Sequence, residues 1–412
     1  MLNKRKIIND PVYGFITIPG EIIFDLIEHR YFQRLRRIKQ LGLTNLVYPG
    51  ALHTRFHHAI GAMHLMGEVI EVLRFKGIEI TEEEAEAATI AILLHDIGHG
   101  PFSHALENSI VNGINHEDLS ELFMERLNEE FEGKLSLAIK VFQDKYKKKF
   151  LHQLVSSQLD VDRLDYLKRD SFYTGVSEGV VSSDRIIKMM HVQNNELVME
   201  VKGIYSIEKF IVARRLMYWQ VYLHKTVIGA ENLLVNILKR AKDLAEKKIE
   251  LFCTPALKEF LYNKHGKADF VNNKDLLDAF AELDDNDVMA SIKVWAKHKD
   301  PVIARMCENI MNRHLFHIEL QNQPFKENLI KELTAKVKQE YKLAQNDCSY
   351  FVFSGIVAND AYRTDKIRIN ILFKDGSLSD IAQASDQLNI DVLSRTVKKH
   401  FLCYPKELEI AS

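Results

Sequence analysis

The chain has 412 residues, of which 46% are hydrophobic and 27% charged, a composition that excludes disordered and fibrous proteins. Its 55 basic and 57 acidic residues leave a net charge of −2, so the total charge gives no reason to expect nucleic-acid or membrane binding. The four cysteines have no CxxC spacing, which argues against a disulfide framework and a thiolate zinc site. The sequence shows neither a signal peptide nor a membrane-spanning run, so we expect a soluble, cytoplasmic protein.

Helical patterns dominate the chain up to about residue 320, and two predicted β-hairpins interrupt them. The first hairpin spans 6–18, where the turn-forming residues of NDPVYG separate two β-like pieces. The second lies in MHVQNNELVMEV, with Asn194 and Asn195 at its turn. After this hairpin we expect one long helix from 207 to 247.

The pattern changes after residue 321. A charged helix runs to Tyr341, SYFVFSGIVA and KIRINILF alternate like strands, and Asp375, Gly376 and Ser377 form a turn. We therefore expect a mainly α protein with a helical core at residues 1–320, which carries the short β-hairpins, and a smaller α+β lobe at 321–412. Because no Pro- or Gly-rich linker separates the two parts, we expect them to pack closely.

The pair His95-Asp96 is the most informative motif of the chain. Imidazole and carboxylate are common metal ligands, but neighbours on a helix point about 100° apart, so a pair that binds one ion needs a helix end. Thr81 and Glu84 form a capping box, residues 85–94 are helical in pattern, and the Gly- and Pro-rich stretch 98–101 ends the helix. The pair therefore falls on the last turn.

Helical phase selects one upstream histidine as a partner for this pair. His58 shares a stripe with Leu65 and other apolar residues, whereas His57 shares one with Glu68. We therefore expect His58 to point inward and His57 outward. A lone inward histidine is more often a hydrogen-bonded core residue than a ligand. The assignment of His58 as a ligand therefore depends on the other candidate ligands, the His95-Asp96 pair and a later carboxylate.

A downstream carboxylate completes the set. In QLDVDRLDYLKRD, Asp162 shares a partly apolar stripe with Leu159 and Tyr166, whereas Asp160 and Asp165 are less suited to bind an ion. The alternative for this segment is a surface helix with alternating charges. The expected ligands of a divalent cation, with iron, manganese and zinc all compatible, are His58, His95, Asp96 and Asp162.

Six segments of the chain, in this order, carry a family resemblance: KIINDPVYG, YFQRLRRIKQLG, PGALHTRFHHAIG, HDIGHGPFSH, NHEDLS and DVDRLDYLKRD. Together they resemble the HD-domain deoxynucleoside triphosphate triphosphohydrolases, a family that includes the vertebrate SAM-and-HD-domain dNTPase and bacterial relatives. The likeness is dense from residue 6 to 225, is looser in the C-terminal part and includes no SAM domain. It implies an HD-domain helical core and a homo-oligomer, either a dimer or a tetramer.

The resemblance implies that a metal-dependent attack on the α-phosphorus of a dNTP releases a deoxynucleoside and inorganic triphosphate. It also implies that the four residues His58, His95, Asp96 and Asp162 are the metal ligands, and that Mg²⁺ binds together with the substrate phosphates. His104 would protonate the leaving 5′ oxygen, and Glu117 would orient His116. The residues expected around the reacting phosphate are His99, His104, His116 and Glu117.

The resemblance also supplies candidate substrate contacts. Arg55 and Arg163 would hold phosphates, Asp170 would accept a hydrogen bond from the 3′ hydroxyl, and Tyr222 would crowd the C2′ position of the sugar. The alternative for Tyr222 is an aromatic core residue. The full expected set is Gln40, Leu41, Arg55, Arg163, Tyr166, Asp170, Arg214, Tyr222 and His224. An activating nucleotide would contact Lys6, Asn9, Gln33 and Arg36.

Three other functions stay open. A different HD phosphohydrolase is compatible with the dyad, although the HDxxED continuation of alarmone hydrolases and the GYP element of cyclic-dinucleotide enzymes are missing. A nuclease or binder of single-stranded nucleic acid would show basic and aromatic residues along a groove, and the near-zero net charge argues weakly against it. A metal-stabilised scaffold would leave the additional histidines without a role.

Overall fold

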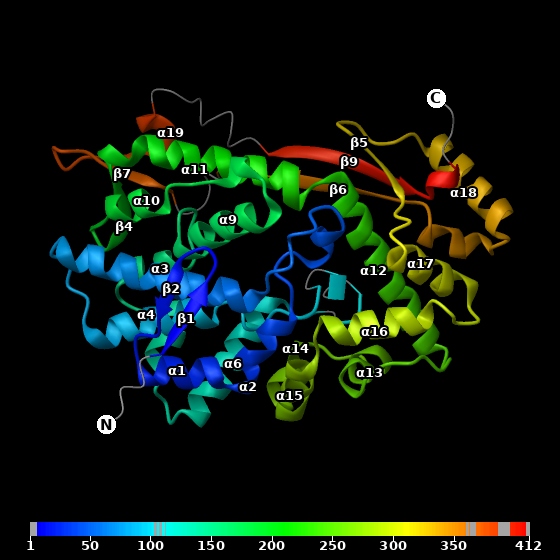
Figure 1. The fold of residues 1–412 in the computed structure, drawn as a ribbon, viewed down its shortest axis with the longest axis horizontal. Coiled ribbons are helices and arrows are strands. Elements are labelled where there is room, and N and C mark those ends of the chain that lie inside the picture. Colours follow the sequence, from blue (N-terminus) through cyan, green and yellow to red (C-terminus); the bar gives the residue numbers. More distant parts are fainter. Residues whose placement is uncertain are drawn as a thin grey trace.

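The computed structural model describes residues 6–102, 105–106, 109–111, 113–359, 362, 368–385 and 396–408. Within these ranges the chain is mainly α, as its sequence predicts, and its strands form three small sheets (Figure 1). The helices are α1 Glu21–Glu28, α2 Arg30–Gln33, α3 Arg55–Phe75, α4 Glu82–Leu94, α6 His116–Glu130, α7 Ser136–Phe142, α8 Lys149–Val155, α9 Val161–Thr174, α10 Ser183–Met189, α11 Ile204–Met217, α12 Lys225–Glu246, α13 Pro255–Tyr262, α14 Lys267–Asn272, α15 Lys274–Glu282, α16 Asp285–Trp295, α17 Pro301–Met311, α18 Glu327–Tyr341 and α19 Ile381–Ala384.

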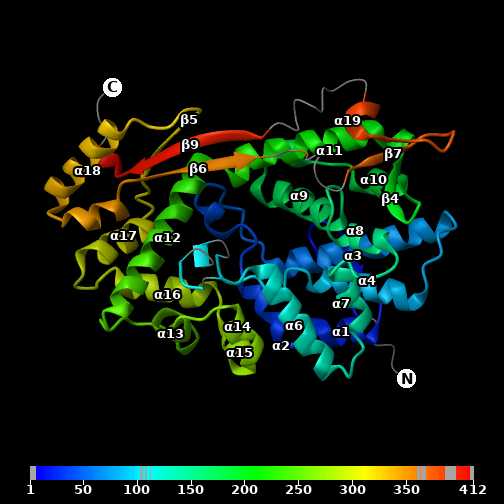
Figure 2. The same ribbon diagram turned by 180° about the vertical axis from the view of Figure 1, so that it is seen from behind.

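Helix α3 is the centre of the part that carries the candidate site. It packs against α4 on one side and α9 on another, and α4 packs in turn against α7 and α8 (Figure 2). Its inward stripe includes Leu65 and Val69, which are fully buried. Helix α4 begins with the predicted capping box, in which the Thr81 hydroxyl accepts from the backbone N–H of Glu84, and His95 forms its C-cap.

Both predicted hairpins are confirmed. Strands β1 Ile7–Asp10 and β2 Gly14–Thr17 pair antiparallel, and the Asp10 carboxylate accepts from two backbone N–H groups in the turn between them. Strands β3 Met190–Gln193 and β4 Glu196–Glu200 also pair antiparallel. Their turn residues Asn194 and Asn195 have φ of 54° and 64°, the left-handed values that a tight hairpin turn requires.

The C-terminal strands join the core directly. Strand β7 Asn370–Leu372 pairs in parallel with β4 and antiparallel with β8 Leu378–Asp380, across the predicted turn at 375–377. In the other sheet β9 Val397–Tyr404 lies between β5 His317–Gln321 and β6 Phe353–Asn359, along the side of the molecule where α11 and α12 meet (Figure 1). The first sheet thus combines strands from before and after residue 321, and in the second sheet β5, which ends at residue 321, pairs with the later strand β9. The expected close packing is present, and the division at residue 320 stays a prediction.

The prediction of one continuous helix from 207 to 247 is wrong, because the structure has two helices in this range. Helix α11 ends at Met217, a π-helical turn follows at Tyr218–Tyr222, and α12 begins only at Lys225. The side chain of His224 accepts from the backbone N–H of Thr226 and caps the new helix. The hydrophobic pattern alone does not reveal this interruption, because the pattern continues across it.

Among the described residues, we find no helix that combines the length and the apolar character needed to cross a bilayer.

Candidate metal centre and adjoining cavity

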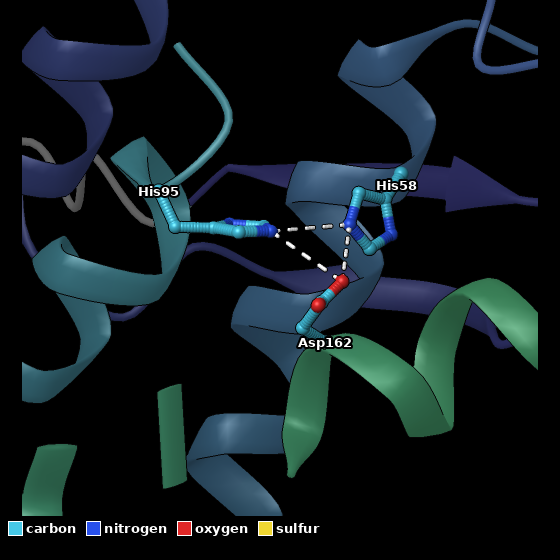
Figure 3. A group of neighbouring side chains, drawn as sticks. All are labelled: His58, His95 and Asp162. Carbon is cyan, nitrogen blue, oxygen red and sulfur yellow. Dashed lines mark hydrogen bonds and ion pairs between the residues drawn. The ribbon is translucent and has the colours of Figure 1, made fainter. Parts of the chain in front are cut away.

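Three of the four predicted ligands meet at one point. His58 comes from α3, His95 from the C-terminal end of α4, and Asp162 from the first turn of α9 (Figure 3). The Nε2 atoms of the two histidines are 3.4 Å apart, and Oδ1 of Asp162 lies 3.2 Å from Nε2 of His58 and 3.5 Å from Nε2 of His95. Ligand atoms at about 2.1 Å from one ion lie roughly 3.0–3.4 Å from one another, so these three fit a single divalent cation.

Hydrogen bonds behind the two histidines fix the tautomer that a metal requires. Nδ1 of His58 lies 2.7 Å from Oδ2 of the buried Asp165, and Nδ1 of His95 lies 2.6 Å from the carbonyl oxygen of Ile92. Both acceptors hold a proton on Nδ1, which leaves the lone pair of Nε2 directed at the cluster. An acceptor on the distal nitrogen is the usual outer support of a metal-binding histidine. The donor set therefore fits a metal site.

Asp96 lies beside this group of three. Its Oδ1 is 3.4 Å from Nε2 of His95 and 3.3 Å from Nε2 of His99. Its Oδ2 accepts a 2.6 Å hydrogen bond from Arg55 and is 3.8 Å from Nε2 of His58. The quartet is thus brought together, with Asp96 shared between the cluster and the Arg55 guanidinium. Its role as the fourth ligand stays a prediction.

The electrostatics of the cluster favour a bound positive charge. Burial alone lowers the pKa of His58, but hydrogen bonds to Asp162 and Asp165 outweigh burial and raise this pKa to about 10. Burial raises the pKa of Asp162, yet hydrogen bonds from His58 and His95 hold it well below its usual range. The carboxylates therefore attract a proton to the same nitrogen that a metal cation would occupy.

A chain of buried ion pairs connects the cluster to the N-terminal hairpin. Arg169, fully buried on α9, donates to both oxygens of Asp165 at 3.0 Å and to Asp10 at 2.7 Å. Gly61 of α3 faces this chain, and a Cβ there would lie 2.1 Å from atoms of Arg169 and Asp165. The sequence pattern predicts Asp162 rather than Asp165 as a ligand, which stays a prediction, and it does not reveal the hydrogen bond of Asp165 to His58. The signal available was the i, i+4 spacing of Asp165 and Arg169 on one helix.

A cavity of about 340 Å³ adjoins the cluster at Arg55. Four of the predicted substrate contacts lie on its wall, namely Gln40, Leu41, Arg55 and Tyr222. The other lining residues are Lys39, Gly42, Leu43, Thr44, Phe102, Ala105, Tyr218, Leu223, Glu231 and Leu234. Arg55 also donates to Asp96, so this side chain lies between the cavity and the predicted metal site.

Tyr222 links the cavity wall to a buried polar group. Its hydroxyl donates to Oδ2 of Asp170 at 2.7 Å, and Nε2 of His53 lies 2.7 Å from Oδ1 of the same carboxylate. The ring of Tyr222 packs against those of Tyr166 and Tyr218, at centroid distances of 6.2 and 5.1 Å. Tyr222 is therefore both part of an aromatic cluster and a lining residue. Each oxygen of the buried Asp170 carboxylate thus has one protein partner, and its contact with a sugar hydroxyl stays a prediction.

The remaining predicted residues lie around this centre with different partners. Arg163 pairs with Asp160, whose carboxylate also caps α9. Arg214 lies 5.9 Å from the ring centroid of Tyr218. His224 caps α12 as described above. None of the predicted substrate roles of these residues is tested by their positions alone.

The structure describes two of the three additional histidines, His99 and His116. The rings of His99 and His116 stack at a centroid distance of 3.9 Å. Burial and the charge of Arg55 lower the pKa of His99 to about 3, so this ring is neutral near pH 7. The side chain of Glu117 is exposed, and His104 lies outside the described residues.

The four residues expected to contact an activating nucleotide lie at the N-terminal end of the chain. Lys6, Asn9 and Arg36 are exposed, and Arg36 donates to the side chain of Gln33 at 2.9 Å. Nζ of Lys6 lies 4.1 Å from the ring centroid of Phe24. Their regulatory role stays a prediction.

Comparison with known proteins supports the metal centre. The HD domain family model matches residues 55–170, and the model of the HD associated region matches residues 181–254. The HD match begins at Arg55 and ends at Asp170, and so includes all four predicted ligands. The chain belongs to the HD-domain phosphohydrolase family.

Individual relatives agree with this assignment. The crystal structure of a phosphohydrolase from Bacteroides thetaiotaomicron is 54% identical, covers 97% of this chain and 100% of its own, and superposes with a TM-score of 0.94. The Bacillus subtilis protein YwfO is 33% identical over 99% of this chain and 94% of its own length. A Dictyostelium discoideum protein, named a deoxynucleoside triphosphate triphosphohydrolase SAMHD1 homolog, is 34% identical over 58% of this chain and 50% of its own length. This HD phosphohydrolase therefore has a named dNTPase among its partial relatives.

Proposed function

We propose that the chain hydrolyses deoxynucleoside triphosphates to a deoxynucleoside and inorganic triphosphate. The observation that carries this proposal is the cavity beside the metal cluster, which has a volume of about 340 Å³ and is lined by Arg55, the residue that also contacts Asp96. A cationic guanidinium next to a metal site suits a polyphosphate, and the aromatic and apolar residues of the wall, among them Phe102, Tyr218 and Leu234, suit a nucleoside. The Dictyostelium relative, whose name states this reaction, supports the choice of substrate.

In this proposal a divalent cation is held by His58, His95, Asp96 and Asp162 and supplies positive charge for phosphoryl transfer. Iron, manganese and zinc all suit this donor set, and Mg²⁺ would accompany the substrate phosphates. Asp165 keeps the proton of His58 on Nδ1, where it does not compete for the ion.

Protein side chains then divide the remaining tasks. Arg55 binds a phosphate, with Arg163 and Arg214 as further cations at the same end of the site. His99 is neutral and can hydrogen-bond a phosphate without repelling Arg55. Because a ring with a pKa of about 3 carries no proton to donate at pH 7, His99 is a poor general acid, and we assign protonation of the leaving 5′ oxygen to His104. The ring of His116 stacks on that of His99.

The sugar would lie against Tyr222, Leu41 and Gln40. The ring of Tyr222, held by its hydrogen bond to Asp170, would crowd a 2′ hydroxyl. Tyr166, Asp170 and His224 complete this set of expected contacts.

Regulation belongs to the same proposal. A homo-oligomer, either a dimer or a tetramer, would place an activating nucleotide against Lys6, Asn9, Gln33 and Arg36. The exposure of Lys6, Asn9 and Arg36 is compatible with such a contact.

The test is turnover of each dNTP and NTP, alone and in mixtures, by metal-loaded protein, with every product resolved by chromatography. The expected products are deoxynucleoside and triphosphate from dNTPs, formed faster than products from NTPs. Release of pyrophosphate with a nucleoside monophosphate, or no turnover in any mixture, would refute the proposal.

A further inference from the structure

The cavity beside the metal cluster contains one acidic side chain that none of the roles above uses. Glu231 lies on the second turn of α12 and lines the cavity together with Leu234 of the same helix. The 3-10 turn Gly42–Leu46, which supplies Gly42, Leu43 and Thr44 to the wall, packs against this helix. The carboxylate thus faces the space that a substrate would fill.

The carboxylate of Glu231 has no protein partner in the part of the chain that the structure describes. It makes no hydrogen bond and no ion pair there, so it is available to a molecule in the cavity. Glu231 is exposed at the cavity, and the loss of solvent around its carboxylate on the cavity wall raises the pKa of Glu231 to about 7. No charged side chain contributes to this shift.

The cavity wall therefore carries charges of both signs, from Arg55 and Lys39 on the one hand and from Glu231 on the other. Arg55 marks the end at the metal cluster, where phosphates belong, and it does not act on Glu231. A phosphate would be repelled by the carboxylate, whereas an uncharged hydrogen-bond donor would satisfy it. The rings of Phe102 and Tyr218 lie on the same wall and offer flat apolar surfaces to a planar group. A nucleotide with its phosphates at Arg55 would have its base near these rings and Glu231.

The hydrogen-bonding pattern of a carboxylate distinguishes the bases. An ionised carboxylate only accepts, and its two oxygens match two adjacent donors. Guanine presents such a pair, N1–H and the N2 amino group, on its Watson–Crick edge. Adenine and cytosine present one donor beside an acceptor, and thymine presents one donor between two carbonyl groups, so each of these places an acceptor against the carboxylate.

We propose that Glu231 selects the base of the nucleotide substrate and that its carboxylate favours guanine. This inference rests on the proposed dNTP hydrolysis for its substrate class. It adds a specificity residue on α12, within the segment matched by the HD associated region.

The test compares dGTP with dITP, which lacks only the N2 amino group, at pH 8, where the carboxylate is ionised. Loss of one hydrogen bond to a charged acceptor corresponds to about a tenfold or larger difference. We expect the wild-type protein to prefer dGTP over dITP by about tenfold in kcat/KM. Glu231→Gln places an amide donor against one of the two guanine donors, and we expect it to bring this ratio close to one while dATP gains relative to dGTP.

Glu246→Gln is the matched control. It makes the same change on the same helix, at an exposed residue paired with Lys264 outside the cavity, and we expect it to keep the wild-type ratio. Equal dGTP to dITP ratios in the wild type and in Glu231→Gln would overturn the inference, even where both hydrolyse dNTPs.

A binding experiment separates this inference from the proposed reaction. Affinities for dGTP and dITP are measured by equilibrium titration of the metal-free wild type and both variants, so the result does not depend on turnover. A preference for dGTP that Glu231→Gln alone abolishes supports base selection, whatever reaction follows. Equal affinities in the wild type, or binding of neither nucleotide, would contradict it.

Discussion

Oδ2 of Asp165 lies 2.7 Å from Nδ1 of His58, and this contact determines which nitrogen of the histidine faces the metal cluster. Both residues are fully buried, and the same carboxylate accepts two hydrogen bonds from Arg169. An outer carboxylate that orients a ligand histidine typically changes metal affinity by about 10–100-fold when it is removed. We therefore predict that metal binding depends on Asp165, although this residue is not one of the four predicted ligands.

Asp165→Asn tests this dependence without a large change of volume. We expect the affinity for Mn²⁺ or Zn²⁺ to fall about tenfold or more, because the amide is a weaker acceptor for the Nδ1 proton and adds a competing donor. Isothermal titration against a competing chelator measures the change. Asp184→Asn, at an exposed position on α10, is the control and keeps the wild-type affinity. Unchanged affinity in Asp165→Asn would remove the supporting role.

The choice of ligands by helical phase gives a second prediction. Asp162→Ala removes an oxygen that lies within 3.5 Å of both ligand histidines, so we expect it to lose bound metal and activity together. His57→Ala removes a side chain whose Nδ1 accepts from the backbone N–H of Thr54 at the start of α3, and we expect it to keep both. Metal content per chain by mass spectrometry, with activity on the same samples, decides the matter. Equal loss in the two variants would refute the assignment.

The pH dependence of metal binding follows from the pKa of His58. Because this pKa is about 10 in the metal-free cluster, the ring is protonated at pH 7 and must lose its proton before Nε2 can bind a cation. Metal affinity should therefore rise with pH from 7 to 9, by up to about tenfold per unit, with release of about one proton per metal. Titrations in two buffers with different ionisation enthalpies count the protons. An affinity that is constant across this range, without proton release, would contradict the prediction.

Local sequence signals predicted the parts of the site that depend on neighbours in the chain. The capping box at Thr81 and the stretch that ends α4 after His95 placed the dyad at a helix end, as found. Helical phase separated His58 from His57, because burial on α3 follows the same stripe that the apolar residues reveal. The two hairpins followed from turn chemistry at Asp10 and at Asn194.

Local sequence patterns did not predict the features that depend on contacts between distant parts of the chain. The parallel pairing of β4 with β7 joins segments about 170 residues apart, and no local pattern encodes it. The π-helical turn at Tyr218–Tyr222 lies within a continuous apolar pattern. The roles of Asp165 and Arg169 likewise became visible only when α9 was packed against α3 and the hairpin residue Asp10.

The most direct test of dNTP hydrolysis is product analysis in water enriched in ¹⁸O. Attack of water on the α-phosphorus forms a new P–O bond, breaks the bond to O5′ and transfers a proton to that oxygen. We predict that metal-loaded protein releases unlabelled deoxynucleoside and inorganic triphosphate that carries one ¹⁸O, and that Asp162→Ala releases neither. Labelled pyrophosphate with a deoxynucleoside monophosphate, or label in the deoxynucleoside, would contradict the account.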